Sequence, residues 1–134
     1  MKIKRINHIG VVVRDADDAA QKLGRVLGVE AGHTEAVPAQ QIESRSLMLG
    51  DCAIEVIESK GNPGVDRFLQ KRGPGMHHIA VEVEGIEDVL GMLTSLGVEL
   101  IDRAPRPGVG GSKVAFVHPK ATGGLLIELV EPTR

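Results

Sequence analysis

The sequence has almost no aromatic residues, since its 134 residues include no tryptophan, no tyrosine and only two phenylalanines, Phe68 and Phe116. It also has no block of lysine and arginine, and its formal net charge is −2. Proteins that bind nucleic acids need a basic surface for the phosphates, and many stack bases on aromatic rings. We therefore expect no nucleic-acid partner.

Cysteine is nearly absent as well, because Cys52 is the single one. One cysteine can form neither an intrachain disulfide nor a cysteine-rich zinc site. The sequence contains no apolar run that resembles a signal peptide or a membrane span, and it enters a strand-like segment within its first residues. We expect a cytoplasmic protein without a membrane partner, and the length suits a single domain.

Two copies of one pattern make up most of the chain. The segment INHIGVVV near the N-terminus matches the later segment MHHIAVEV, which aligns His8 with His78. Both copies continue through a helix-like stretch and close with an apolar run containing acids, which aligns Glu55 with Glu128. Two histidines and two glutamates are a complete ligand set for a divalent metal ion. Because burying carboxylates without a cation is costly, the repetition favours a metal site over a hydrogen-bonded core.

Each copy predicts the element order βαβββ. Both histidine segments alternate like strands, and the small residues Gly10 and Ala80 follow the histidines by two positions on the same face. The helix-like stretches carry apolar stripes, with Asp15 as the predicted N-cap of the first and Gly28 and Gly97 as the predicted ends. The further strands are expected at residues 29–34, 42–49, 53–58, 98–102, 112–118 and 125–130.

These elements predict one α+β domain in which the first βαβββ module spans residues 3–60 and the second spans 75–132. Residues 61–74 are the expected linker, because they are rich in glycine and proline. Within it, Phe68 and Leu69 are expected to hold a short helix against the body. The two modules should share one core, since the chain is short for two independent ones.

Five segments of the sequence carry recognisable motifs, which are NHIG at 7–10, FLQKRG at 68–73, GMHHIA at 75–80, VAFVHPK at 114–120 and GGLLIEL at 123–129. These segments resemble the vicinal oxygen chelate superfamily, which includes glyoxalase I, extradiol dioxygenases and fosfomycin-resistance enzymes. Within this superfamily, the residues are most similar to the methylmalonyl-CoA epimerase family. The HHIA and HPK blocks are specific in combination, and the resemblance covers nearly the whole chain.

The resemblance implies a vicinal oxygen chelate fold, in which the tandem modules form a curved mixed sheet around a metal cleft. It implies one divalent ion per chain, with cobalt favoured and manganese, nickel or zinc as alternatives. The implied ligands are His8, Glu55, His78 and Glu128. The implied activity is interconversion of (2R)- and (2S)-methylmalonyl-CoA, an acyl-CoA substrate, by proton abstraction through a metal-stabilised enolate.

Glu128 is the first candidate for the catalytic base. Inversion needs a second proton carrier, which is Glu55, a water molecule or an unassigned group. Some relatives carry a glutamate considered a second base where Ser44 stands here. Lys113 and Lys120 are the candidates for binding the substrate's carboxylate or CoA phosphates, unless they are solvated lysines at strand ends. The acids expected at the surface are Glu35, Glu82, Glu84, Glu87 and Glu99.

Two other functions fit the same pattern. A lactoylglutathione lyase of the glyoxalase I type uses the same four ligands and also moves a proton, although the HPK and FLQKRG segments favour the epimerase. A binding protein could sequester an antibiotic in the same fold without chemistry, but it would not need all four metal ligands. We also expect a homodimer, because sheet edges and the apolar outer face of Ile9, Val11 and Val13 need cover from helices or a partner.

Overall fold

The computed structural model describes residues 2–133, which form two compact units. The N-terminal unit holds residues 8–77, and the C-terminal unit holds residues 2–7 together with 78–133. Strand β1 (Ile3–Val12) contributes its first residues to one unit and its last residues to the other. No helix in the described part of the chain is both long enough and apolar enough to cross a bilayer.

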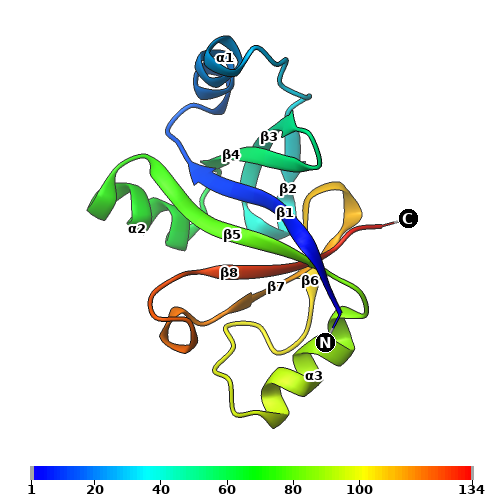
Figure 1. The fold of residues 1–134 in the computed structure, drawn as a ribbon. Coiled ribbons are helices and arrows are strands. Elements are labelled where there is room, and N and C mark those ends of the chain that lie inside the picture. Colours follow the sequence, from blue (N-terminus) through cyan, green and yellow to red (C-terminus); the bar gives the residue numbers. More distant parts are fainter. Residues whose placement is uncertain (1, 134) are drawn as a thin grey trace. The chain divides into compact units, whose positions relative to one another are not determined.

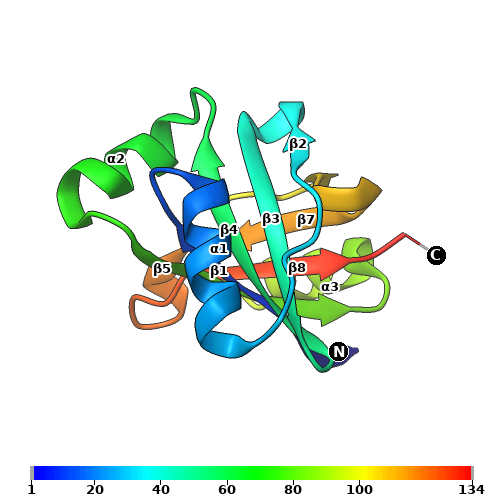
Figure 2. The same cartoon turned by 90° about the horizontal axis from the view of Figure 1, so that it is seen from above.

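The strands of the N-terminal unit lie in the order β2-β3-β4-β1 (Figure 1). Its other elements are α1 Ala16–Leu27, β2 Glu35–Val37, β3 Ile42–Leu49, β4 Cys52–Ser59 and α2 Pro63–Arg72. Strand β1 is parallel to β4, whereas β3 is antiparallel to both β2 and β4. Helix α1 packs against β3 and β4 (Figure 2) and buries a core of Val13, Ala16, Ala20, Leu47 and Val56.

The helices of this unit begin and end at the residue types that the sequence indicates. The Asp15 carboxylate accepts a hydrogen bond from the Asp18 N–H at 3.1 Å, which confirms Asp15 as the N-cap of α1. Gly28 ends the helix with a φ of 69°, a left-handed conformation that glycine adopts without steric cost. The expected short helix after the first module is α2, which Asn62 caps by accepting from the Val65 N–H at 3.0 Å.

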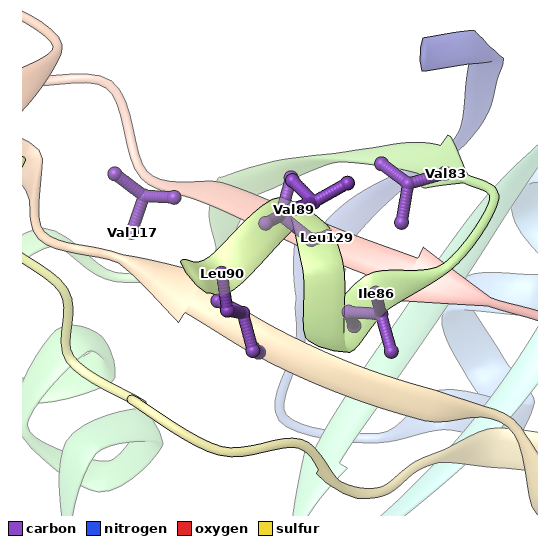
Figure 3. Close-up of a cluster of buried hydrophobic side chains, with 7 residues drawn as sticks. Val83, Ile86, Val89, Leu90, Val117 and Leu129 are labelled. Carbon is purple, nitrogen blue, oxygen red and sulfur yellow. The ribbon is translucent and has the colours of Figure 1, made fainter. Parts of the chain in front are cut away.

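The C-terminal unit repeats this arrangement with strand order β5-β8-β7-β6. Its elements are β5 Gly75–Val83, α3 Ile86–Ser95, β6 Arg106–Pro107, β7 Lys113–Val117 and β8 Ile127–Glu131. Strand β5 is parallel to β8, and β7 is antiparallel to β8 and β6. Figure 3 shows the core between α3 and these strands, made of Val83, Ile86, Val89, Leu90, Ala115, Val117 and Leu129. The predicted α+β fold of tandem βαβββ modules is therefore confirmed.

The edge strand of each module is shorter than predicted. Residues 29–34 contain only an isolated bridge between Ala31 and Leu47, and β2 starts after them. Arg45 Nε donates to the Gly32 carbonyl at 2.9 Å, so a side chain occupies an acceptor that a regular strand would offer to a neighbouring backbone. An edge segment has backbone partners on one side only, and a side chain can replace them there.

The second edge segment departs from the prediction in the same way. Residues 98–102 contain only the bridge between Leu100 and Val117, and the short β6 follows them. Here the Asp102 carboxylate accepts the Phe116 N–H at 2.9 Å, which replaces a backbone acceptor of the ladder.

A second pair of equivalent glutamates binds the helix N-termini. In the N-terminal unit, Glu58 Oε1 accepts the N–H of Ala16, the first residue of α1, at 2.9 Å. In the C-terminal unit, Glu131 accepts the N–H groups of Gly85 and Ile86 at 2.8 and 3.1 Å, at the start of α3. A carboxylate at a helix N-terminus satisfies free N–H groups and interacts favourably with the helix dipole. In both modules, the last strand thus fixes the helix through a side chain.

Candidate metal centre

One histidine and one glutamate come together inside the N-terminal unit. His8 Nδ1 lies 3.8 Å from Glu55 Oε2, and both side chains are more than nine-tenths buried. Strand β1 pairs in parallel with β4, and its register places Gly10 opposite Glu55. Residues opposite each other in a sheet share a face, so His8, two positions before Gly10, lies on the face of Glu55.

The C-terminal unit contains the equivalent pair. His78 Nε2 lies 3.2 Å from Glu128 Oε1, with side-chain exposures of 4% and 6%. Strand β5 pairs in parallel with β8, and Ala80 stands opposite Glu128. In both units, therefore, the residue facing the glutamate has little or no side chain.

The chemistry of these donors fits a divalent metal ion. Each pair supplies an imidazole nitrogen and a carboxylate oxygen, which are ligands that first-row divalent metals accept. Each pair also buries a carboxylate, and buried carboxylates need a cation or strong hydrogen bonds to stay ionised.

An aromatic ring lies beside the histidine–glutamate pair of the C-terminal unit, and an arginine lies beside that ring. The ring of Phe116 packs edge-on against the His78 imidazole, with 5.5 Å between their centroids. The guanidinium of Arg106 lies 5.8 Å from the Phe116 centroid, and its Nε lies 3.1 Å from Asp102 Oδ1. The sequence analysis did not identify Phe116 and Arg106 as neighbours of the candidate ligands. Phe116 stands opposite Glu128 in the register, so the alternation of the two predicted strands was the signal that could have indicated it.

The substrate-binding candidates Lys113 and Lys120 are both exposed. Lys113 stands opposite Glu131 in the strand register and pairs with Glu87 of α3 at 2.8 Å. This ion pair raises the pKa of Lys113 and lowers the pKa of Glu87. Its register neighbours place Lys113 on the helix-covered face, opposite to the face of Glu128. Lys120 lies in the turn after β7, where its N–H donates to His118 Nδ1 at 3.1 Å.

Ser44, which stands where some relatives carry glutamate, is buried at 1% exposure. Its register partner in β4 is Ile57, so it lies on the same face of the N-terminal unit as Glu55. Within residues 2–133, Ser44 Oγ has no hydrogen-bond partner. A neutral hydroxyl can donate or accept a hydrogen bond, but it is a poor base at neutral pH.

The prediction that Glu82 lies at the surface is wrong. It is 8% exposed and accepts hydrogen bonds from Arg5 Nε at 3.2 Å and Asn7 Nδ2 at 3.1 Å. A buried carboxylate is tolerated here because donors from β1 satisfy it. These bonds hold the first residues of β1 to β5 within the C-terminal unit.

Comparison with known proteins shows the family to which the chain belongs. Residues 7–116 match the glyoxalase/bleomycin resistance protein/dioxygenase superfamily. The chain belongs to this superfamily. The resemblance that the sequence motifs indicate is thereby confirmed, and the paired βαβββ units are its fold.

Named relatives within the superfamily include epimerases. The chain is 38% identical to the uncharacterized protein YqjC of Bacillus subtilis, over 97% of this chain and 94% of the relative. It is 33% identical to an ethylmalonyl-CoA/methylmalonyl-CoA epimerase of Cereibacter sphaeroides, over 95% and 97%. A variant of the Streptomyces coelicolor methylmalonyl-CoA epimerase, solved in complex with 2-nitronate-propionyl-CoA, superposes with a TM-score of 0.92 at 30% identity, covering 98% and 96%.

Proposed function

We propose that this superfamily member is a metal-dependent epimerase that interconverts (2R)- and (2S)-methylmalonyl-CoA. The observation that carries the proposal is the buried histidine–glutamate pair that recurs at equivalent positions of both units. The epimerase names of the relatives in Cereibacter sphaeroides and Streptomyces coelicolor support an acyl-CoA substrate. We propose His8, Glu55, His78 and Glu128 as the ligands of one divalent ion, with cobalt as the favoured metal.

The reaction requires removal of a proton from a carbon between a thioester and a carboxylate. When bound, the divalent ion supplies Lewis acidity that stabilises negative charge on the substrate's oxygens. Glu128 is the proposed base, because it is a buried carboxylate on the last strand of the C-terminal unit, beside the small Ala80. A positioned base of this kind contributes about a hundredfold to ten-thousandfold to a rate. Glu55 is the proposed carrier for the opposite face of the substrate carbon, since Ser44 offers only a hydroxyl.

Metal content tests the ligand set directly. We expect the wild-type protein to retain about one divalent ion per chain after purification and dialysis, and the His8→Ala and His78→Ala variants to lose it. Elemental analysis provides the measurement, and His33→Ala serves as the matched control because His33 is exposed. Full occupancy in both ligand variants would place the metal elsewhere.

Substrate choice separates the epimerase from the glyoxalase I type lyase. We expect solvent deuterium to enter the second carbon of the methylmalonyl group of methylmalonyl-CoA, measured by mass spectrometry. The same protein should not convert the hemithioacetal of methylglyoxal and glutathione. The reverse result would assign the lyase, and inactivity with both substrates despite bound metal would favour a binding protein.

A further inference from the structure

Arg106 is a cation on the same sheet face as Glu128. In the register of the C-terminal unit, Arg106 stands opposite Val114, and Val114 stands opposite Val130. Val130 follows Glu128 by two positions, so strand alternation places all of these side chains on one face. The contact between Arg106 and Phe116 agrees with this placement, because Phe116 stands opposite Glu128 and packs against His78.

Two neighbours orient the guanidinium group of Arg106, but they occupy only part of its N–H donors. Asp102 lies beside its Nε at 3.1 Å, and the Phe116 ring supports the planar group at 5.8 Å. Asp102 is itself fixed, because its second oxygen accepts the Phe116 N–H at 2.9 Å. Within residues 2–133, Asp102 is the sole ion-pair partner of Arg106, whose side chain stays 42% exposed. The guanidinium fork carries five N–H donors, so most of them stay available for an anion.

We propose that Arg106 binds an anionic group of the acyl-CoA substrate, a deduction that rests on the proposed function. Lys113, one of the two candidates from the sequence, faces the helix side and pairs with Glu87. Arg106 instead combines a fixed orientation, solvent access and the face of the metal-ligand candidates His78 and Glu128. Its planar fork matches the two oxygens of a carboxylate or a phosphate. Both groups occur in methylmalonyl-CoA.

Titration calorimetry on the full-length, cobalt-loaded protein tests the proposal with three probes. Methylmalonyl-CoA carries the carboxylate and the phosphates, propionyl-CoA lacks the carboxylate, and methylmalonyl-pantetheine lacks the CoA phosphates. For Arg106→Gln, we expect the Kd of methylmalonyl-CoA to rise about tenfold or more, which is the size of one lost charge-assisted contact. Arg106→Lys keeps the charge but loses the fork, so its Kd should lie between those of the wild type and Arg106→Gln.

The three probes also identify the anionic group. An equal rise for propionyl-CoA assigns the contact to the phosphates, whereas a rise confined to the two methylmalonyl probes assigns it to the carboxylate. Arg103→Gln is the matched control, because Arg103 is an exposed arginine on the same segment. Metal content and the urea midpoint of unfolding should stay near wild type, which separates lost binding from lost structure.

Two results would overturn the role of Arg106 alone. One is an unchanged Kd of methylmalonyl-CoA in Arg106→Gln, and the other is an equal rise in Arg103→Gln, which would indicate surface charge rather than a specific contact. If Arg106→Gln fails to fold, Arg106→Lys decides: a Kd equal to wild type overturns the proposal, and a raised Kd supports it. A wild-type protein that binds none of the three probes would overturn the proposed function as well.

Discussion

Glu55 and Glu128 occupy equivalent positions in the two units, yet we expect different roles for them. Both are buried beside a histidine and face a residue with little or no side chain. The sequence motif GGLLIEL around Glu128 is one of the segments that resemble the epimerases, whereas members of the superfamily vary between glutamine and glutamate at Glu55. Glu128 therefore stays the proposed base.

The exchange of each glutamate for glutamine tests this assignment. Glutamine keeps the shape and one oxygen ligand, so both variants should fold and retain some metal. We expect Glu128→Gln to lower deuterium incorporation into methylmalonyl-CoA by about a hundredfold or more, because an amide cannot accept the proton. Glu55→Gln should lower it much less, because Glu128 can still exchange the proton on its own face of the substrate carbon. Near-wild-type exchange in Glu128→Gln with an inactive Glu55→Gln would move the base to the N-terminal unit.

At the scale of the elements, the last strand of each module holds the N-terminus of its helix. The Lys60 ammonium and the Ala16 N–H lower the pKa of Glu58, and the Gly85 and Ile86 N–H groups lower the pKa of Glu131. A carboxyl with a lowered pKa in the folded state stabilises the fold above its unfolded pKa. That contribution is lost as the pH falls below about 4.5, the ordinary value, through the lower folded pKa.

Glu131→Gln should therefore reduce the dependence of stability on acidic pH. At pH 7 we expect the variant to unfold at a lower urea concentration, since loss of a helix-capping carboxylate costs about 1 kcal/mol. Between pH 5 and pH 3 its free energy of unfolding should change less than that of wild type. Glu35→Gln is the control, because Glu35 is exposed. A wild-type pH profile in Glu131→Gln would show that the contact adds no stability.

Two helical glycines should respond oppositely to alanine. A Cβ on Gly24 of α1 would stand 2.7 Å from the backbone oxygen of Val29, whereas a Cβ on Gly91 of α3 would meet nothing within 4 Å. Gly91→Ala should stabilise the protein by about 0.5–1 kcal/mol through helix propensity. Gly24→Ala should destabilise it, because a backbone oxygen cannot move aside like a flexible side chain. Thermal unfolding of both variants measures the difference, and a stabilised Gly24→Ala would contradict the close approach.

At the scale of the whole molecule, the homodimer stays a prediction. The prediction rests partly on the apolar outer face of Ile9, Val11 and Val13. Helix α1 covers part of this face, because Val11 and Val13 pack in the core below the helix. Large apolar side chains are nevertheless exposed in the C-terminal unit, with Leu96 at 69%, Ile101 at 51% and Ile3 at 50%.

Light scattering at micromolar concentration decides the oligomeric state. We expect a mass of about twice the 14.2 kDa of one chain. A mass near 14.2 kDa would contradict the dimer and leave these side chains exposed to solvent.

The sequence by itself determined the repeated βαβββ order, the helix caps at Asp15 and Gly28, and the alignment of His8 with His78 and Glu55 with Glu128. These features depend on short-range periodicity and on a repeat, which are visible without any knowledge of contacts. Only the tertiary structure decided how far the edge segments form strands, because Arg45 and Asp102 replace backbone partners there. It also decided the burial of Glu82, the capping of the helix N-termini by Glu58 and Glu131, and the faces of the sheet on which Lys113 and Arg106 lie. Each of these depends on pairing between segments distant in sequence, and such pairing sets which face and which partner a charged side chain receives.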